Sequence, residues 1–343
     1  QNNLPLFTSK KKVYDLLGAA ENDGLYLSSN GPEAVFQVFY SAYVNHVKET
    51  GRTHFLATDM EDATILYSLK RMEKFGCSSK VIPVNQYGQL TKEILEQNLR
   101  PRSAMMSISW ANNLTGVIHP LEDIAEVCKS KQVLLHVDCS SIIGKSYFRY
   151  EDMQVDFLTF DGSLFHDPLG SGAVVSKWSL PFTPFNPCPG FESVSKMLSL
   201  AETLEIASEN FDHVCTETAR LRDRLEKNVK DQIGDVVIPF AEVHRLPNVS
   251  VMCFPGVFNE SLLYLLNSQG VYASMGGGKY QKISHILHLC QFDKNISQSA
   301  LSFCLSHETT QQQVDKASQI IVDCYKKLIK CSISLKQEEK NES

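Results

Sequence analysis

The stretch WANNLTGVIHPLEDIAEVCKSKQVLLHVDCSSIIGK, residues 110–145, decides how the chain is expected to fold. It joins a helical pattern, PLEDIAEVCKSK (120–131), to a short apolar run, VLLHV (133–137), which ends at the polar residue Asp138. Another apolar run, AMMSIS (104–109), precedes it. Buried strands that alternate with helices are typical of a parallel sheet covered on both faces.

The same alternation extends outward in both directions. Four further apolar runs are predicted strands with helical patterns between them: GLYLS (24–28), THFLA (53–57), KVIPV (80–84) and FLTF (157–160). A long helical segment, short apolar runs and a last helix follow: 192–230, VSVMCF (249–254), VYAS (271–274), ILHLC (286–290), ALSFCL (300–305) and 309–330. These patterns predict an α/β protein with a large domain of mainly parallel sheet at 1–207 and a smaller α+β domain at 208–332. The charged end, 333–343, is predicted to be disordered.

Polar residues follow the predicted strands and define a candidate pocket. Ligands of open α/β sheets bind beyond the carboxyl ends of the strands. Those ends carry residues 28–31, 59–62, 110–113, 138–141 and 161–163.

The composition excludes some classes of partner. The 343 residues are 43% hydrophobic and 21% charged, and the formal net charge is −6. A chain with this acidic balance lacks the positive field that recruits nucleic acids or anionic membranes. Its longest apolar runs are too short to span a bilayer. Ten cysteines without a CxxC pair, and no signal peptide at the visible start, predict reduced thiols and a cytoplasmic location.

Six segments resemble, in the same order, the cysteine desulfurases of the NifS/IscS-like type. Besides residues 110–145 they are KKKVYDLLGAA with LYLSSNGPEA (10–20 and 25–34), MQVDFLTFDGSLFHDPLGSGAVV (153–175), TARLRDRLEKN (218–228), PNVSVMCFPGVFNESLL (247–263) and the terminal helix (309–330). Those enzymes are class-V members of the fold-type-I pyridoxal phosphate (PLP) enzymes. The resemblance covers nearly the whole chain and implies the fold-type-I PLP-transferase architecture for the large domain.

Several polar positions of the family's cofactor site are retained. The resemblance implies that Asp138 pairs with the pyridinium nitrogen of PLP and that Asn113 bonds the ring hydroxyl. It also places Ser29, Asn30 and Gly31 in the turn that holds the cofactor phosphate. From the residues alone, Asp138 could equally cap backbone N–H groups after its strand, and Asn113 could belong to a plain turn.

The groups that carry the family's chemistry are replaced. Leu164 stands at the position of the lysine that forms the Schiff base, and a leucine cannot form an imine. Asp161 stands where a serine donates to the cofactor phosphate, and a carboxylate there would repel a dianion. Pro32 removes a backbone donor from the phosphate turn. The remaining replacements are Ser163 for the histidine before the lysine, Asp62 for the ring-stacking histidine, Ser141 for a glutamine, Lys279 for the nucleophilic cysteine and Ser302 for the arginine that clamps the substrate carboxylate.

These replacements predict a pseudoenzyme with no intact catalytic residue. We expect no covalently bound PLP, no desulfurase turnover, and a binding or regulatory role in sulfur or iron–sulfur metabolism. Candidate partners are an active paralogue and a sulfur-transfer or iron–sulfur assembly protein. The alternative is a PLP-family enzyme that holds PLP or another ligand noncovalently through Asp138, Asn113 and the turn at 28–31.

Two other features suggest chemistry less strongly. Lys279 in the glycine-rich segment SMGGGKYQK (274–282) could supply an amine if it reached the pocket, but a mobile surface loop is the favoured interpretation. HILHLC (285–290) is predicted to be a strand, in which only His288 and Cys290 share a face. Two ligands do not make a metal site, so none is expected.

The resemblance also implies a two-fold homodimer, because fold-type-I enzymes place their active sites at a dimer interface. Aromatic and apolar residues crowd the predicted helix at 32–51 and the segment 181–191: Val35, Phe36, Phe39, Tyr40, Tyr43, Phe182, Phe185 and Phe191. Such surfaces favour association. The alternative is that both segments belong to the core.

Overall fold

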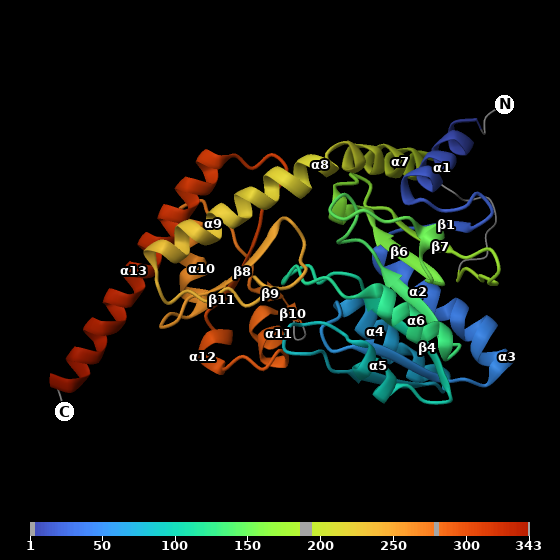
Figure 1. Ribbon diagram of the computed structural model, residues 1–343, viewed down its shortest axis with the longest axis horizontal. Helices are drawn as coiled ribbons and strands as arrows, with labels where there is room; N and C mark the ends of the chain where they lie inside the picture. The colour runs from blue at the N-terminus through green and yellow to red at the C-terminus, as the bar shows by residue number, and fades with distance from the viewer. Residues whose placement is uncertain (1–3, 186–193, 278–280, 342–343) are drawn as a thin grey trace. The chain divides into compact units, whose positions relative to one another are not determined.

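The structure is a computed structural model that describes residues 4–185, 194–277 and 281–341. The chain forms two compact units (Figure 1). The first unit comprises residues 1–85, 89–112 and 118–211, and the second comprises 86–88, 113–117 and 212–343. No helix in the described ranges is long and apolar enough to cross a lipid bilayer.

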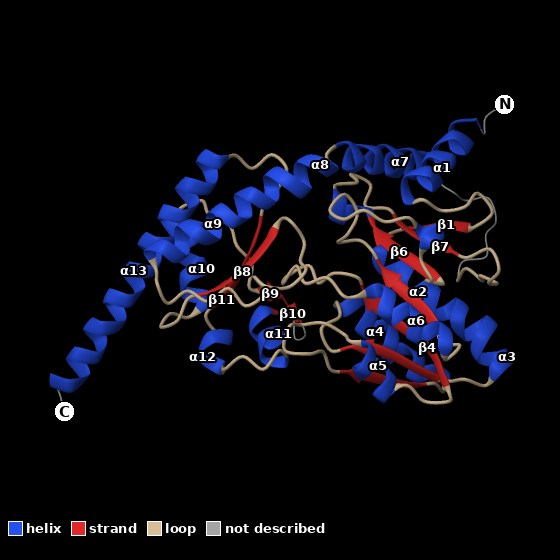
Figure 2. Ribbon diagram, viewed as in Figure 1, coloured by secondary structure: helices blue, strands red, loops and turns tan. Residues whose placement is uncertain are grey.

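A seven-stranded sheet forms the centre of the first unit (Figure 2). Its strands are β1 (Gly24–Ser28), β2 (His54–Thr58), β3 (Ser78–Ile82), β4 (Ser103–Ser109), β5 (Leu134–Asp138), β6 (Phe157–Asp161) and β7 (Gly172–Ser176). Their order is β1-β7-β6-β5-β4-β2-β3. The strands β6, β5, β4, β2 and β3 are parallel, and β7 runs antiparallel to both β1 and β6. The mainly parallel sheet predicted from the sequence is confirmed.

Helices cover both faces of this sheet. The β2–β3 crossover contains α4 (Ala63–Met72) and the β4–β5 crossover contains α6 (Leu121–Ser130). These crossovers run in opposite directions across the sheet, so right-handed connections put α4 and α6 on opposite faces. The helix α2 (Gly31–Ala42) packs beside α4, and its Phe39 is fully buried in their shared core. The other helices are α1 (Leu4–Leu17), η1 (Tyr43–Val47), α3 (Lys48–Thr50), η2 (Glu73–Phe75), α5 (Lys92–Asn98), η3 (Tyr150–Asp152), η4 (Gly162–Phe165) and α7 (Val194–Glu209).

The second unit has its own core between a small sheet and long helices. The strand β8 (Val249–Cys253) pairs antiparallel with β11 (Ala300–Cys304), and the helices α9 (Ala219–Gln232), α10 (Asn259–Ser268) and α13 (Gln311–Asn341) contribute to the same buried cluster. The remaining elements are α8 (Phe211–His213), which begins at the unit boundary, η5 (Val214–Thr218), β9 (Gly276–Gly277), β10 (Gln281–Lys282), α11 (Ile283–Leu289) and α12 (Lys294–Ser297).

Three sequence expectations for the second unit are wrong. HILHLC lies in a helix, α11, rather than in a strand. Its buried residues Ile283, Ile286 and Leu287 have the helical spacing, which the six-residue segment was too short to reveal. Residues 271–274 form only an isolated bridge, from Ser274 to Ser302. The helix α13 continues to Asn341, because the end of the chain holds good helix formers and neither glycine nor proline.

The aromatic residues of α2 are largely covered by the same chain. Phe39 belongs to the core, while Phe36 and Tyr40 contact the ring of Phe185 edge to face, at centroid distances of 5.7 and 5.2 Å. The ring of Phe182 stacks on Tyr26. Phe36 and Tyr40 are partly buried by these contacts, whereas Phe185 is 52% exposed, so the homodimer stays a prediction. Phe191 lies outside the described residues.

Candidate functional site

A small cavity lies at the carboxyl ends of the strands in the first unit. Its lining comes from the segments that follow β1, β2, β4, β5 and β6: Gly31, Pro32, Val35, Asp62, Thr64, Ile65, Ser109, Asp138, Ser140, Asp161 and Leu164. The sheet therefore gathers six positions singled out in the sequence, namely Gly31, Pro32, Asp62, Asp138, Asp161 and Leu164. The cavity volume is about 50 Å³, which is room for only a few water molecules.

The N-terminus of α2 forms one wall of this cavity, and the chain's own carboxylates surround it. Asn30 caps the helix, with its Oδ1 accepting from the Glu33 N–H at 2.9 Å, and Glu33 Oε2 accepts from the Ser29 N–H at 2.7 Å. The Asp161 carboxylate lies against Gly31, where an added Cβ atom would be 2.5 Å from Asp161 Oδ2. Helix N-termini ordinarily bind external anions through free N–H groups. Here acidic side chains already occupy that region.

Asp138 ends a chain of hydrogen bonds that crosses three strands. Its Oδ2 accepts from Thr159 Oγ1 at 3.0 Å, Thr159 Oγ1 lies 2.8 Å from His136 Nε2, and His136 Nδ1 lies 2.7 Å from Ser107 Oγ. Because the Thr159 hydroxyl donates to Asp138, His136 must donate to Thr159 from Nε2 and accept from Ser107 at Nδ1. Burial lowers the pKa of His136 to about 3, which keeps its ring neutral.

The same carboxylate also caps the backbone after β5. Asp138 Oδ1 accepts from the Ser140 N–H at 3.1 Å, as expected if Asp138 closes the turn. Burial raises the pKa of Asp138 to about 6, and the hydrogen bonds from Ser140 and Thr159 oppose that shift. Two hydrogen bonds therefore fix the orientation of the Asp138 carboxylate, which lines the cavity as an acceptor.

Glu61 joins the end of β2 to the end of β4, a role that was not predicted from the sequence. Its Oε1 accepts from Thr58 Oγ1 at 2.6 Å and its Oε2 accepts from the Ser109 N–H at 2.7 Å. Glu61 is only 2% exposed, and burial raises the pKa of its carboxyl to about 8. Its position in the segment 59–62, directly after a strand, was the signal that could have identified Glu61 as a site residue.

Ser163 and Leu164 are neighbours in the short helix η4, which follows β6. Leu164 in η4 lines the cavity with its side chain 41% exposed. Ser163 turns its hydroxyl to Asp161, whose Oδ1 accepts from Ser163 Oγ at 2.6 Å. Ser141 is buried and does not line the cavity.

Three further assigned positions lie in the second unit or outside the described residues. Asn113 and Ser302 belong to the second unit, where Ser302 Oγ donates to the Leu114 carbonyl at 2.6 Å. Lys279 lies outside the described residues. Among the residues that are described, no three His, Cys, Asp or Glu side chains gather as a group that could hold a metal ion.

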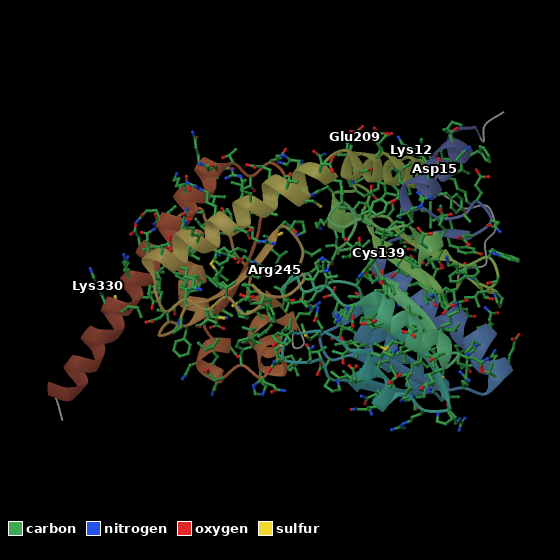
Figure 3. The ribbon with its side chains drawn as sticks, viewed as in Figure 1. Lys12, Asp15, Cys139, Glu209, Arg245 and Lys330 are labelled. Carbon is green, nitrogen blue, oxygen red and sulfur yellow. The ribbon has the colours of Figure 1, made fainter. Side chains whose placement is uncertain are left out.

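Cys139 is the described thiol that follows Asp138 in sequence. It is fully buried inside the first unit (Figure 3), and burial raises the pKa of its thiol well above the ordinary value. Because the thiolate is the reactive form, Cys139 lacks the activation that a nucleophile requires. Cys188 lies outside the described residues.

Residues 6–187 match the family described as aminotransferase class-V. The chain belongs to the aminotransferase class-V family. It is 27% identical over 335 residues to the cysteine desulfurase of Nostoc sp. (strain PCC 7120 / SAG 25.82 / UTEX 2576), covering 94% of this chain and 82% of that relative. The cysteine desulfurase of Gluconacetobacter diazotrophicus is 28% identical over 336 residues, with 94% and 83% covered.

Solved structures of class-V proteins agree with this assignment. A structure described as a NifS-like protein has a TM-score of 0.84 and 26% identity, covering 94% of this chain and 87% of that chain. A NifS-like protein from Rickettsia africae has the same fold, with a TM-score of 0.79 at 20% identity over 94% of this chain and 87% of that one. Within class V, this chain is a NifS/IscS-like member with the fold-type-I architecture.

The family depends on PLP, but the residues of this class-V chain do not fit that cofactor. The cavity of about 50 Å³ is far smaller than the roughly 300–1,000 Å³ of ordinary ligand pockets. The Asp161 carboxylate lies at the helix N-terminus that would receive the phosphate, and Pro32 lacks an N–H to donate there. Leu164 offers no amine. Among the cavity's described lining residues, Asp138 is the group suited to a protonated ring nitrogen, and no reaction step through PLP follows from this site.

Proposed function

We propose that this class-V protein is a noncatalytic relative of the cysteine desulfurases, with a binding or regulatory role in sulfur or iron–sulfur metabolism. The observation that carries the proposal is the combination of Leu164 with the Asp161 carboxylate at the N-terminus of α2. A class-V catalyst needs an amine for the Schiff base and an anion site for the phosphate, and both positions hold unsuitable groups. A change at one position alone would leave the other intact.

The preserved scaffold supports a role that depends on the fold. The buried chain of hydrogen bonds from Ser107 to Asp138 and the contacts of Glu61 with Thr58 and Ser109 hold the strand ends together. Similarity to cysteine desulfurases suggests a sulfur-transfer protein, an iron–sulfur assembly protein or an active paralogue as the partner, in the cytoplasm. This chain is 27% identical to the Nostoc cysteine desulfurase. We include a homodimer of the class-V type in the proposal.

The cofactor test is direct. The purified protein is mixed with PLP, treated with borohydride and mapped by peptide mass spectrometry, with the Nostoc cysteine desulfurase as a positive control. We expect no reduced PLP adduct on this chain and neither sulfide nor alanine from added cysteine. A stoichiometric adduct on any single lysine, Lys279 above all, would overturn the pseudoenzyme proposal and favour an enzyme. Saturable PLP absorbance without an adduct would favour the noncovalent alternative.

Association is tested separately. We expect sedimentation equilibrium to give twice the chain mass of 38.5 kDa. Phe185 is 52% exposed, so the cluster of Phe36, Tyr40 and Phe185 offers apolar surface that a partner chain can cover. A species at the chain mass would remove the homodimer and leave a heteromeric partner.

A further inference from the structure

A second cavity in the first unit has the size and lining of a ligand site, although the cavity at the strand ends does not. Its volume is about 400 Å³, within the roughly 300–1,000 Å³ that small-molecule pockets occupy. It shares no lining residue with the strand-end cavity. The proposal that follows goes beyond the proposed function, and it does not depend on the loss of PLP chemistry.

The walls of this cavity are aromatic. Trp110, directly after β4, contacts Phe148 edge to face at a centroid distance of 5.4 Å. Tyr147 is 74% exposed beside the opening, and the half-buried Met153 adds a polarizable side chain. The buried floor is apolar, with Val155 nearly inaccessible. Large apolar surface that remains uncovered beside such a floor indicates a binding site rather than core.

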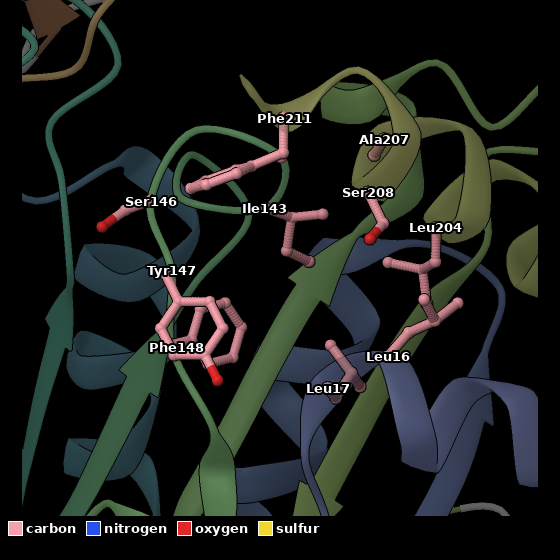
Figure 4. A pocket seen from close by; sticks show the side chains of 11 residues that line it. Leu16, Leu17, Ile143, Ser146, Tyr147, Phe148, Leu204, Ala207, Ser208 and Phe211 are labelled. Atoms are coloured by element: carbon pink, nitrogen blue, oxygen red, sulfur yellow. The ribbon is translucent and has the colours of Figure 1, made fainter. Parts of the chain in front are cut away.

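The loop that carries two of these rings also lines a smaller cavity. Tyr147 and Phe148 border a space of about 150 Å³ that α1 and α7 close with Leu16, Leu17 and other apolar side chains (Figure 4). The two cavities thus share one pair of aromatic residues.

The charges at the rim are mostly negative. Glu122, in the first turn of α6, and Asp152, in η3, are exposed carboxylates that line the cavity. The cation among the described lining residues is Arg149, and Arg149 Nε donates to Glu151 Oε1 at 2.9 Å, so its charge is balanced by that ion pair. The rim therefore carries an excess of two negative charges over an aromatic wall. Aromatic faces and carboxylates together attract organic cations.

We propose that this aromatic cavity binds a small organic cation with an apolar body, such as an arylalkylamine. The apolar body rests on Val155 and against the rings of Trp110 and Phe148. The ammonium group lies at the rim, near Glu122 and Asp152. An anionic ligand is disfavoured by the same carboxylates, and a neutral ligand of equal shape gains only the apolar contacts.

The experiment uses the full chain and a tryptophan reporter. The chain holds two tryptophans, and Trp178 is 68% exposed outside the cavity, so Trp178→Phe makes Trp110 the single reporter. The fluorescence of this variant is titrated with phenethylamine, 2-phenylethanol and 3-phenylpropionate, which differ in charge but share the phenyl body. We expect saturable binding of the amine, about tenfold weaker binding of the alcohol, and no saturation with the acid.

Substitutions at the rim separate charge from shape. Glu122→Gln and Asp152→Asn should each weaken the binding of the amine several-fold and leave the binding of the alcohol unchanged. Asp123→Asn, at an exposed acid on the same helix that does not line the cavity, is the matched control and should change neither. Thermal unfolding of each variant checks that the fold is intact. Equal affinity for all three probes, no saturation with the amine, or an equal effect of Asp123→Asn would each overturn the proposal.

Discussion

The Asp161 carboxylate lies against Gly31, the first residue of α2, so that a Cβ atom at position 31 would be 2.5 Å from Asp161 Oδ2. A helix N-terminus attracts anions because its first N–H groups and its dipole both favour negative charge. In this chain an internal carboxylate takes that place. The arrangement links the loop after β6 to the turn after β1.

Restoring the lysine alone should therefore fail to restore PLP binding. Leu164→Lys supplies an amine, but Asp161 still repels the phosphate, and we expect little borohydride-reducible adduct. The double substitution Asp161→Ser/Leu164→Lys removes that repulsion and should bind PLP at least about tenfold more tightly, since one removed like-charge contact is worth more than about 1.4 kcal/mol. Absorbance titration and peptide mapping measure both variants, with Asp161→Ser as the control. Equal PLP binding by the single and double variants would show that Asp161 is not the obstacle.

Glu61 should make the first unit less stable as the pH rises from about 6.5 to 7.5. Its pKa of about 8 in the folded state exceeds the ordinary 4.5, so the folded state holds the extra proton throughout this range. The stabilisation is fully present below the unfolded pKa and is lost as the pH rises through the folded one. One proton gives a slope of about 1.4 kcal/mol per pH unit in the free energy of unfolding.

Glu61→Gln should flatten this slope. The buried His136, with a pKa of about 3, makes stability rise with pH, but only below its unfolded pKa of 6.5. Asp138, with a pKa of about 6, is largely ionised above pH 6.5 and contributes little to the slope there. Urea unfolding followed by tryptophan fluorescence at several pH values measures the slope. Glu122→Gln, at an exposed carboxylate, is the control. An unchanged slope in Glu61→Gln would assign the pH dependence to another group.

The thiols of the native protein should differ sharply in their rates of alkylation. Cys304 and Cys331 are exposed, whereas Cys139 is fully buried and its pKa is raised well above the ordinary value by burial. We expect iodoacetamide to label Cys304 and Cys331 first and to leave Cys139 unmodified until the protein unfolds, as read by peptide mass spectrometry. Labelling in urea is the control for chemical competence. Rapid native alkylation of Cys139 would make it a candidate nucleophile.

Local pattern was sufficient to predict the sheet and the place of the site. The buried apolar runs that end at Asp138 and Asp161 are short and continuous, so their strands follow from a few neighbouring residues. Because parallel strands end at one edge, these two carboxylates were expected to meet, and both line the same cavity. The replacement at Leu164 likewise needed only the order of the motifs.

Contacts between distant segments were beyond the sequence pattern. Glu61 acquires its bridging role from the N–H of Ser109, which lies 48 residues later in the chain. The covering of Phe36 and Tyr40 depends on where Phe185 returns to α2. The helix α11 was missed because its period is visible only when Ile283, outside HILHLC, is included. Each of these depends on tertiary packing rather than on local preference.

The relay behind Asp138 gives the last prediction. Thr159→Val keeps the side-chain volume but removes the hydroxyl that accepts from His136 and donates to Asp138. Two buried polar groups would lose a partner, so we expect the free energy of unfolding to fall by about 1–3 kcal/mol. Thr159→Ser keeps the hydroxyl and loses one methyl group, which costs about 1 kcal/mol.

The comparison of these two variants tests the hydrogen bonds rather than the packing. Urea unfolding should rank Thr159→Val below Thr159→Ser, and the exposed Ser163→Ala should stay within about 0.5 kcal/mol of the parent chain. Nitrogen NMR of the imidazole should show a neutral ring with the proton on Nε2 in the parent chain and in Thr159→Ser. If Thr159→Val is as stable as Thr159→Ser and leaves the His136 signals unchanged, the relay does not hold Asp138 in place.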